Sequence, residues 1–486
     1  MSPREVSSWL ATADRGSPWE QVNAVVAGIG VAGFAAADAL QHLGASVTIL
    51  DDRDDEVTRD RATLMEILGA HVRLGSGAGR SLPPDVDLVV TSPGWPPYAP
   101  IFTVAAARQV PVWGDVELAW RLRDLHQPAP WLCLTGTNGK TTTVKMLESM
   151  LRADGLRAVA AGNVGLPLCE VVMDPEPFDV LAVELSSHQL HWLHSLSAES
   201  AAVLNVAPDH LTWHGDVARY AAAKASIYAN CQVACVYNVE DPQTRRMVEE
   251  AVVVEGCRAI GFTLGIPSIG MVGVVDDVLA DRAFIEGRDR NAAELARVTD
   301  VPTGAPHNVA NALAAAALAR SHGVSGGAVR RGLRSFRLDK HRIADVATVA
   351  EVRYVDDSKA TNPHAALASL RAFDSVVWIA GGLAKGASFD DLVEQAQPRL
   401  RGVVALGADR AEIIAALSRH APDVPVIEVE DTETEVMARV VTAAASLARP
   451  GDTVLLAPAC ASQDLFADYS ARGDAFVAAV EQLRRH

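Results

Sequence analysis

The residues whose types and spacing most clearly permit chemistry form the stretch TGTNGKTT at positions 135–142. This stretch follows the apolar run WLCL and precedes a helical pattern. The backbone N–H groups of a glycine-rich turn and of the helix N-terminus behind it offer unpaired donors and a positive dipole end to an anion. Lys140 can then reach the terminal phosphates of a nucleotide, and the Thr141 hydroxyl can ligate Mg²⁺. The stretch therefore predicts a phosphate-binding loop.

This loop departs from the common form GxxxxGK[ST], and we interpret it as a short variant. Its paired glycines are Gly136 and Gly139, and Leu134 stands where the common form has its first glycine. A strand–helix turn without a ligand is the alternative, which the lysine and three threonines of GKTTT disfavour. The helix behind the loop is predicted by apolar residues at helical spacing, which are Val144, Leu147, Met150 and Leu151.

A second glycine pattern, GIGVAG, lies near the N-terminus. Gly28, Gly30 and Gly33 stand between a predicted strand and a predicted helix, and Asp51 closes the next strand about 20 residues later. The turn SPG at positions 92–94 follows another strand, at the end where ligands of open sheets bind. The pattern predicts a bound diphosphate without choosing between NAD and another nucleotide. A turn that serves only strand–helix packing is the alternative.

The middle of the chain carries a carboxylate, a row of histidines and a lysine in an apolar setting. Glu184 follows an apolar strand and is a candidate Mg²⁺ ligand, with a helix-capping role as the alternative. We interpret His188, His191 and His194 as one helix face, because no Asp, Glu or Cys completes a ligand set there. Lys224 lies in RYAAAKASIY, where an ordinary lysine extends to water. If its head is buried, the neutral amine is favoured and can react with CO₂ to form a carbamate, which ligates metal.

Composition limits the class of protein. The chain has 486 residues, of which 49% are hydrophobic and 21% charged, and this is ordinary for a soluble globular protein of about three domains. A net charge of −17 argues against a general nucleic-acid or anionic-membrane partner. The six cysteines contain no CxxC pair, and the Cys231/Cys235 spacing alone is too little for a zinc site, so we expect reduced, cytosolic thiols. We also expect no signal peptide and no membrane span, because the N-terminus lacks an apolar segment and the apolar stretches carry glycines and a charge.

Strands alternating with helices along the whole chain predict an α/β protein with parallel sheets built from βαβ units. We expect three domains, at residues 1–129, 130–338 and 339–486, with the first joint in the stretch HQPAP. A polar, glycine-dotted stretch at 261–306 precedes the predicted helix HNVANALAAAALARSHG. DAFVAAVEQLRRH predicts a packed final helix.

In this order, the motifs resemble those of the Mur ligases of peptidoglycan precursor synthesis. The resemblance covers nearly the whole chain and rests on GTNGKTTT, GNVGLP, VELSSHQL, APHNVANALAAAALA, DKHR, DDSKATN, AGG and APACASQDLFADYSARGDAF. It implies a Rossmann-like N-terminal domain for a UDP-substrate, a central P-loop ATPase-type α/β domain, and a C-terminal Rossmann-like α/β domain that closes on ATP and binds an amino acid. Within the family, DDSKATN favours the members that add D-glutamate to UDP-N-acetylmuramoyl-L-alanine, and Asn138 stands where the L-alanine-adding members have histidine.

The resemblance also implies the ligands and the residues that hold them. The implied cofactors are ATP, Mg²⁺ at two sites and a CO₂-derived carbamate on Lys224. The implied ATP-binding residues are Gly136, Thr137, Asn138, Gly139, Lys140, Thr141, Thr142, Asn308, Asn311, Arg342 and Asp357. The implied UDP-substrate residues are Gly30, Val31, Asp51, Asp52, Arg53, Gly94, Asn163 and His210. The implied D-glutamate residues are Thr361, Lys385, Ser462 and Tyr469, and the implied metal ligands are Thr141, Glu184, His210 and carbamylated Lys224. The implied catalytic residues are Lys140, Glu184, His210, Lys224 and Lys359.

The implied reaction is ATP-driven amide formation. A substrate carboxylate attacks the γ-phosphoryl group of ATP, and the amine of D-glutamate then displaces phosphate from the acyl phosphate. The meeting of two anions requires neutralisation by Lys140, Lys359, Arg342 and the metals. No Ser or Cys nucleophile is expected, and we interpret Cys460 as structural. We expect a cytoplasmic monomer.

Three residues differ from the family's pattern. Ala32 stands where a threonine often donates to the diphosphate, and Gln463 and Tyr469 stand where Leu and Phe are expected. Two other classes were weighed against the ligase. A NAD-dependent dehydrogenase leaves TGTNGKTT unexplained, and a non-catalytic nucleotide-binding protein has no need of Lys140, Glu184 and Lys224 together.

Overall fold

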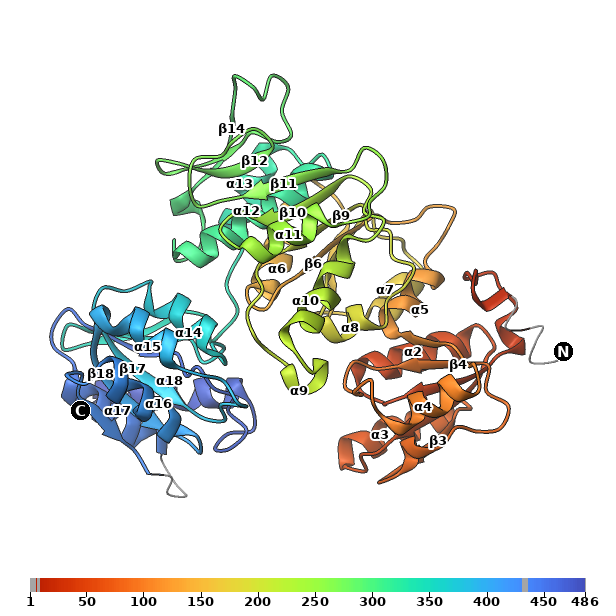
Figure 1. Cartoon of the computed structure of the whole chain (residues 1–486), viewed down its shortest axis with the longest axis horizontal. Coiled ribbons are helices and arrows are strands. Elements are labelled where there is room, and N and C mark those ends of the chain that lie inside the picture. Colours follow the sequence, from red (N-terminus) through yellow and green to blue (C-terminus); the bar gives the residue numbers. More distant parts are fainter. Residues whose placement is uncertain (1–5, 7–8, 431–435, 486) are drawn as a thin grey trace. The chain divides into compact units, whose positions relative to one another are not determined.

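The computed structural model describes residue 6, residues 9–430 and residues 436–485. Within this range the chain folds around three β-sheets flanked by helices (Figure 1). Its contacts divide it into two compact units, one of Met1–Val301 with Val309–Phe336 and the other of Pro302–Asn308 with Arg337–His486. Part of the N-terminal stretch in which we expect no signal peptide lies outside the described residues. No helix among those residues is long and apolar enough to cross a membrane.

The first sheet has five parallel strands in the order β3-β2-β1-β4-β5, which is a Rossmann-like order. Its strands are β1 (Asn23–Ala27), β2 (Ser46–Asp51), β3 (His71–Leu74), β4 (Leu88–Thr91) and β5 (Val112–Gly114). Its helices are α2 (Val31–His42), α3 (Glu56–Ile67), α4 (Pro100–Ala107) and α5 (Asp115–Leu122), with short 3₁₀ turns η1 (Trp19–Gln21) and η2 (Ala78–Arg80). A Cβ on Gly33 would lie 1.8 Å from the Gly28 carbonyl oxygen, so only glycine permits α2 to approach β1 this closely.

The second sheet has nine strands in the order β14-β13-β12-β11-β10-β9-β6-β8-β7. They are β6 (Trp131–Thr135), β7 (Ala158–Gly162), β8 (Val180–Glu184), β9 (Ser200–Val203), β10 (Ala234–Asn238), β11 (Arg258–Phe262), β12 (Met271–Val275), β13 (Val278–Asp281) and β14 (Ala293–Arg297). The helices are α6 (Lys140–Ala153), α7 (Leu168–Met173), α8 (Ser187–His191), α9 (Leu211–His214), α10 (Val217–Ala225), α11 (Pro242–Glu249), α12 (Pro306–Ser321) and α13 (Gly326–Ser335), with 3₁₀ turns η3 (Ser226–Tyr228) and η4 (Val298–Asp300). The strands from β7 to β12 in this order are parallel.

The prediction of purely parallel sheets is wrong at two places. The polar stretch at 261–306, where the sequence pattern indicates no strand, contains β12, β13 and β14, and these pair antiparallel. Only Asp276 and Asp277 connect β12 to β13, and so short a connection can join only antiparallel strands. In the third sheet, β15 also pairs antiparallel with β16.

The third sheet has the order β15-β16-β20-β17-β18-β19. Its strands are β15 (Ala344–Val349), β16 (Val352–Asp356), β17 (Val376–Gly381), β18 (Leu400–Leu406), β19 (Val426–Glu428) and β20 (Thr453–Leu456). Its helices are α14 (Pro363–Leu370), α15 (Asp390–Ala396), α16 (Arg410–His420), α17 (Val436–Leu447) and α18 (Tyr469–Arg485), with 3₁₀ turn η5 (Gln397–Arg399). The predicted final helix is confirmed as α18, which buries Phe476 and Val480.

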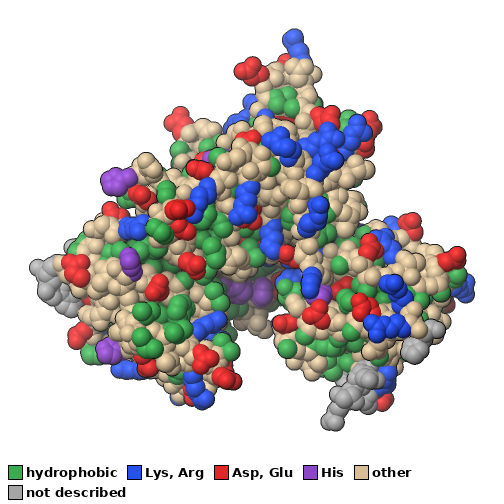
Figure 2. Space-filling view, turned by 180° about the vertical axis from the view of Figure 1, so that it is seen from behind, with side chains coloured by type: hydrophobic (Ala, Val, Ile, Leu, Met, Phe, Trp, Pro, Cys, Tyr) green, Lys and Arg blue, Asp and Glu red, His purple; other side chains and the backbone are tan. Residues whose placement is uncertain are grey.

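Surface charge is mixed on the face shown in Figure 2. Acidic and basic side chains are interspersed there, with small groups of hydrophobic side chains between them. Scattered exposed hydrophobic residues of this kind are normal for a folded protein.

The helix behind the phosphate loop is fixed by a close contact with α13. The residues predicted to form its apolar face are all buried, namely Val144, Leu147, Met150 and Leu151. A Cβ on Gly332 of α13 would lie 2.5 Å from the Met150 Cα atom. Ser149 Oγ donates to the Gly332 carbonyl oxygen at 2.8 Å. The two helices therefore meet backbone to backbone near the C-terminal end of α6.

We expect Gly332→Ala to lower the free energy of unfolding by roughly 1–3 kcal/mol, because its methyl group forces α13 away from α6. Gly327→Ala in the same helix is the matched control, since its Cβ would meet only the end of the Arg331 side chain at 3.3 Å. The better helix propensity of alanine makes that control neutral or stabilising. Urea denaturation of both variants measures the difference, and equal stabilities would contradict the packing argument.

Candidate active site

The phosphate loop lies between the carboxyl end of β6 and α6, and two asparagines hold its shape. Gly139 caps α6 with a φ of 83°, and a Cβ there would lie 2.3 Å from Asn311 Oδ1. The Asn138 N–H donates to Asn205 Oδ1 at 2.9 Å, and Asn205 Nδ2 donates to the Asn138 carbonyl oxygen at 3.1 Å. The loop glycine is therefore required by both its backbone conformation and the neighbouring carboxamide.

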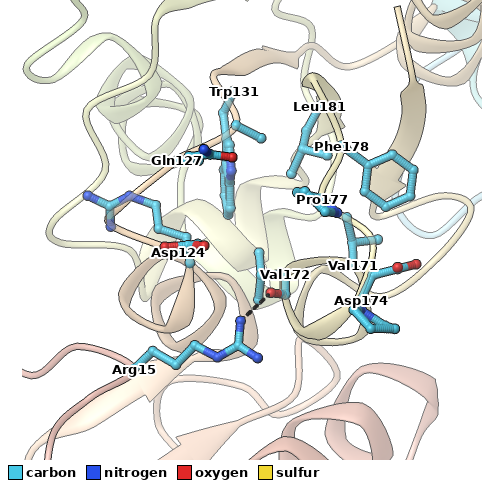
Figure 3. Close-up of a pocket in the computed structure, with 13 residues that line it drawn as sticks. Arg15, Asp124, Gln127, Trp131, Val171, Val172, Asp174, Pro177, Phe178 and Leu181 are labelled. Atoms are coloured by element: carbon cyan, nitrogen blue, oxygen red, sulfur yellow. Dashed lines mark hydrogen bonds between the residues drawn. The ribbon is translucent and has the colours of Figure 1, made fainter.

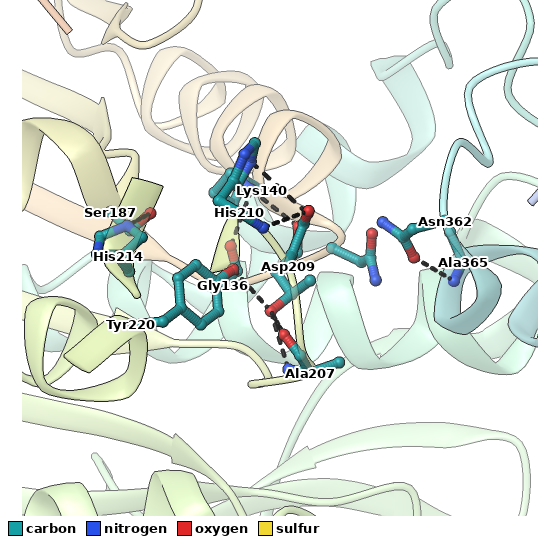
Figure 4. A network of polar contacts seen from close by, with 12 residues as sticks. Gly136, Lys140, Ser187, Ala207, Asp209, His210, His214, Tyr220, Asn362 and Ala365 are labelled. Carbon is teal, nitrogen blue, oxygen red and sulfur yellow. Dashed lines mark hydrogen bonds and ion pairs between the residues drawn. The ribbon is translucent and has the colours of Figure 1, made fainter. Parts of the chain in front are cut away.

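Two lysines converge on one carbonyl oxygen of this loop. Lys140 Nζ lies 2.8 Å from the Gly136 carbonyl oxygen (Figure 4), and Lys224 Nζ lies 2.8 Å from the same atom. Lys224 is 1% exposed, and its Nζ lies 4.6 Å from the centroid of the Tyr220 ring. Burial, followed by the nearby charge of Lys140, holds the pKa of Lys224 well below its usual value. The amine of Lys224 is therefore buried and does not extend to water. Burial was the condition under which a neutral amine is expected from the sequence.

Glu184 ends the neighbouring strand β8 and has an unsatisfied oxygen. Its Oε1 accepts a hydrogen bond from Asn163 Nδ2 at 2.8 Å, whereas its Oε2 is buried without a hydrogen-bond partner among the described residues. The capping alternative is wrong, because Ser186 and Gln189 form the capping box of α8. A buried carboxylate oxygen without a partner is unfavourable, and a cation supplies what it lacks. With the Thr141 hydroxyl at the start of α6, this edge offers the oxygen donors that suit Mg²⁺.

Histidine rings pack beside this edge. His210 is half-exposed, and its Nε2 lies 3.6 Å from Asp209 Oδ2 (Figure 4). The centroids of the His188 and His210 rings are 4.7 Å apart. Burial, followed by the charges of nearby histidines, lowers the pKa of His188 to about 3, so this ring is neutral. α8 ends at His191, so the interpretation of the three histidines as one helix face is wrong for His194, which lies beyond the helix.

In the first sheet, Asp51 organises the glycine turn rather than standing free. Its Oδ2 accepts from the Ile29 N–H and from Arg53 Nη2, each at 2.9 Å. Burial alone would raise the pKa of Asp51, but the hydrogen bonds from Arg53 and Ile29 outweigh it and lower the pKa. Asp52 Oδ1 accepts from the backbone N–H groups of Gly77 and Gly79 at 3.2 and 3.0 Å. These contacts leave the guanidinium of Arg53 partly exposed beside the turn of Gly30.

In the C-terminal unit, the predicted residues follow the carboxyl ends of three adjacent parallel strands. β16 is followed by Asp357, Lys359 and Thr361, β17 by Lys385, and β20 by Ser462. The backbones of Leu383 and Ala461 exchange two hydrogen bonds, of 2.9 and 3.0 Å, which tie the last two loops together. Because strand ends of a parallel sheet meet at one edge, the five residues belong to one surface.

The buried side chain of Arg472 connects these loops. Its Nε donates to Ser358 Oγ at 3.0 Å and its Nη2 to the Ser358 carbonyl oxygen at 2.9 Å. Its Nη1 donates to the Cys460 carbonyl oxygen at 3.1 Å. The ARGDAF motif alone gave Arg472 no role, because its partners lie on loops far away in the sequence.

Two further contacts define this surface. Lys359 Nζ lies 3.8 Å from the centroid of the Tyr469 ring, so the tyrosine that replaces an expected phenylalanine stacks on a predicted catalytic lysine. Asp357 is buried and accepts a very short hydrogen bond from Ser369 Oγ. Burial raises the pKa of Asp357 to about 6. Cys460 is also buried, and burial raises the pKa of its thiol to about 12, in line with a structural role.

The remaining predicted ATP residues divide between the units. Asn311 packs on the phosphate loop, whereas Asn308 groups with the C-terminal unit and its Nδ2 donates to Thr303 Oγ1 at 2.9 Å. Tyr220 was not predicted from sequence, although its spacing of four residues from Lys224 on α10 places both on one helix face. Asn205 was not predicted either, because no local pattern gave a signal for it.

A separate cavity of about 150 Å³ lies elsewhere in the first unit (Figure 3). Trp131, Phe178 and Leu181 give it an apolar wall, and Arg15 and Arg123 reach it from the polar side. It contains none of the residues predicted from sequence, so the strand-end edges described above are the better candidates for catalysis.

Comparison with known proteins fits this arrangement. Residues 134–319 match the model of the Mur ligase middle domain, and residues 341–460 match that of the Mur ligase, glutamate ligase domain. The chain therefore belongs to the Mur ligase family of ATP-dependent ligases, whose members use ATP and Mg²⁺. Its closely related sequences include the UDP-N-acetylmuramoylalanine–D-glutamate ligases of two streptomycetes. The enzyme of Streptomyces coelicolor is 61% identical over 460 residues, which are 94% of this chain and 97% of that protein.

The second streptomycete enzyme, from Streptomyces avermitilis, is 60% identical over 465 residues, covering 96% of this chain and 99% of that protein. Among solved structures, a pseudomurein peptide ligase type C from Methanothermus fervidus superposes with a TM-score of 0.58 at 16% identity, covering 95% of this chain and all of that one. That likeness concerns the fold alone. The predicted α/β fold and family are thus confirmed, whereas the domain boundaries at 129/130 and 338/339 stay predictions.

The buried carboxyl group of Asp115 makes the stability of the folded protein depend on pH, and this dependence can be measured. Asp115 starts α5, and its Oδ2 accepts from Gln189 Nε2 of α8 at 3.1 Å. Burial raises the pKa of Asp115 to about 6. Because the folded protein then binds the proton more tightly than the unfolded chain, the Asp115 contribution to the free energy of unfolding falls as pH rises from about 4 to about 6, by on the order of 2–3 kcal/mol.

We expect Asp115→Asn to remove this contribution. The variant should gain stability relative to the parent as pH rises from about 4 to about 6, and the difference should then level off. Urea denaturation across that pH range measures it, with Asp423→Asn at an exposed position as the control. A pH-independent difference between parent and Asp115→Asn would show that Asp115 is ionised throughout.

Proposed function

We propose that this chain joins D-glutamate to UDP-N-acetylmuramoyl-L-alanine at the expense of ATP, releasing ADP and phosphate. The names of relatives at 60–61% identity over nearly the whole chain support this substrate pair. The structural observation that carries the chemistry is the buried edge where Lys140 and Lys224 share the Gly136 carbonyl beside the unpartnered Glu184 oxygen. Such an edge needs a cation and an anionic ligand, and MgATP is both.

In the proposed reaction, a carboxylate oxygen of UDP-N-acetylmuramoyl-L-alanine forms a bond to the γ-phosphorus, and the bond from that phosphorus to ADP breaks. The amine nitrogen of D-glutamate then bonds to the acyl carbon, phosphate leaves, and the amine loses its proton. The chain's part is to neutralise and orient anions. Lys140 would serve the phosphates, and Thr141, Glu184 and His210 would hold Mg²⁺, which supplies charge neutralisation.

We further propose that Lys224 carries a carbamate. A neutral amine bonds to the carbon of CO₂ and releases one proton, which converts a cation into an anionic oxygen ligand. The burial of Lys224 and the lowered pKa support the neutral amine. Conversion would also replace the neutral amine with an anion near Lys140, whose ammonium group shares the same carbonyl oxygen and would attract it.

The substrate subsites are assigned by the same reasoning. The UDP-substrate would lie on the glycine turn, with contacts from Gly30, Val31, Asp51, Asp52, Arg53, Gly94, Asn163 and His210. Arg53 supports this assignment, because Asp51 holds a partly exposed guanidinium beside the N-terminus of α2. D-glutamate would lie at the strand-end surface of the C-terminal unit, with contacts from Thr361, Lys385, Ser462 and Tyr469. Asn308, Asn311, Arg342, Asp357 and Lys359 would serve ATP.

We expect ADP release only when ATP, Mg²⁺, UDP-N-acetylmuramoyl-L-alanine and D-glutamate are all present, with L-glutamate inactive. Lys140→Ala should lower the rate by roughly 100-fold or more, because a preorganised phosphate contact is lost. Lys145→Ala in the same helix is the control and should turn over like the parent. A coupled ADP assay measures the rates. Turnover with another amino acid would overturn the substrate assignment while keeping the ligase class.

The carbamate predicts that removal of CO₂ lowers turnover and that bicarbonate restores it. ¹³C-bicarbonate should give one carbamate NMR signal per chain in the parent and in Lys145→Arg, but none in Lys224→Arg, whose guanidinium is not a nucleophilic amine. Lys224→Arg should turn over roughly 100-fold more slowly, as expected for the loss of a metal ligand worth several kcal/mol. Full turnover of CO₂-depleted parent with no ¹³C signal would exclude the modification.

A further inference from the structure

Three cysteines that are separate in sequence meet at the amino ends of β10 and β11. Cys231 precedes β10, Cys235 is its second residue, and Cys257 immediately precedes β11. Their sulfur atoms all lie within 4.8 Å of one another, and those of Cys235 and Cys257 are 3.8 Å apart. The spacing of Cys231 and Cys235 alone predicted no metal site. The third thiol, that of Cys257, is brought near them by the pairing of β10 with β11.

We propose that Cys231, Cys235 and Cys257 form a binding site for one thiophilic metal ion. Sulfur atoms bound to a single ion at about 2.3 Å stand about 3.8 Å apart in tetrahedral geometry and about 4.0 Å apart in trigonal geometry. The separation of Cys235 and Cys257 matches the tetrahedral value, and no pair in the cluster is more than 4.8 Å apart. Within the described part of the chain no His, Asp or Glu joins the group. An all-sulfur set selects soft ions, such as Cu⁺ in a trigonal site or Zn²⁺ with solvent as the fourth ligand.

A disulfide fits these positions less well. Ala234 is in register with Arg258, so Cys235 lies one residue after this pair and Cys257 one residue before it. Strand rise and spacing separate such diagonal Cα atoms by about 8 Å. A disulfide spans about 4.4–6.8 Å between Cα atoms, so forming one would require the backbone to move. A metal ion bridges the sulfurs where they already are.

Thiols lose their protons when they bind a metal ion, so uptake at this cluster would release protons. Cys231 and Cys235 are buried, while Cys257 is partly exposed and gives an entry route.

The site is remote from the phosphate edge. The phosphate loop follows the carboxyl end of β6, whereas the cysteines lie at the amino ends of strands parallel to it. Metal bound here would join β10, β11 and the segment after η3, and so raise stability by binding the folded state alone. The inference is independent of the proposed substrates.

The test uses the full chain, reduced and freed of metal. Zn²⁺, Cd²⁺ and chelator-buffered Cu⁺ are added in separate arms, and bound metal per chain is measured after gel filtration, together with sulfur-to-metal charge-transfer absorption for Cd²⁺ and Cu⁺. We expect one ion per chain, a higher melting temperature, and at least about tenfold weaker binding in Cys235→Ser and Cys257→Ser. Cys169→Ser removes a buried cysteine outside the cluster and should bind metal like the parent. Comparing the affinities measured with Zn²⁺ and with Cu⁺ identifies the ion that the site prefers.

Circular dichroism and ATP binding establish that each variant is folded, and the partly exposed Cys257 is the safer position if Cys235→Ser does not fold. Equal metal binding by the parent and Cys257→Ser would overturn the proposal. So would a parent that takes up no ion in any arm, or one in which mild oxidation links Cys235 to Cys257 without prior metal uptake.

Discussion

Two lysine side chains share the Gly136 carbonyl oxygen, and the state of the buried one follows from this crowding. Lys140 and Lys224 each lie 2.8 Å from that atom, and Lys224 is almost fully buried. Burial and the Lys140 charge disfavour a second ammonium ion where water is excluded, so the neutral amine of Lys224 is favoured. The protein therefore surrounds them with compensating groups, namely the Tyr220 ring, the carboxylates of Asp209 and Glu184, and the loop carbonyls. A site built this way is set up to receive negative charge.

In the C-terminal unit, the three loops that follow β16, β17 and β20 must be held together to form one surface. Arg472 does so with donors to Ser358 and to the Cys460 carbonyl, and its burial lowers the pKa of its guanidinium to about 10. Lys359 lies between this anchored segment and the Tyr469 ring. The unit thus uses the buried cation of Arg472 as scaffold, while Lys359, the cation proposed to serve ATP, stays partly exposed.

Local sequence patterns predicted those elements for which the hydrophobic periodicity and the turn residues indicate the same structure. The phosphate loop, the GIGVAG turn, α6 and α18 are of this kind, because each is determined by residues within one turn of one another. The antiparallel edge of β12–β14 was missed, since its short strands are embedded in a glycine-dotted stretch and their pairing depends on a two-residue connection. Arg472, Asn205 and the third cysteine were also missed, because their roles arise from contacts between distant segments. The sequence predicted Glu184 as a Mg²⁺ ligand near the phosphate loop. Only the structure shows that its Oε2 atom is buried without a hydrogen-bond partner among the described residues.

The contact between Gly139 and Asn311 has an evolutionary consequence. Two separate barriers keep residue 139 a glycine: its left-handed backbone and the Asn311 carboxamide that fills the space of a Cβ. A smaller residue at 311 would clear the space and leave the backbone barrier in place. A change at position 311 therefore opens no path to another residue at position 139, which stays glycine whatever side chain faces it.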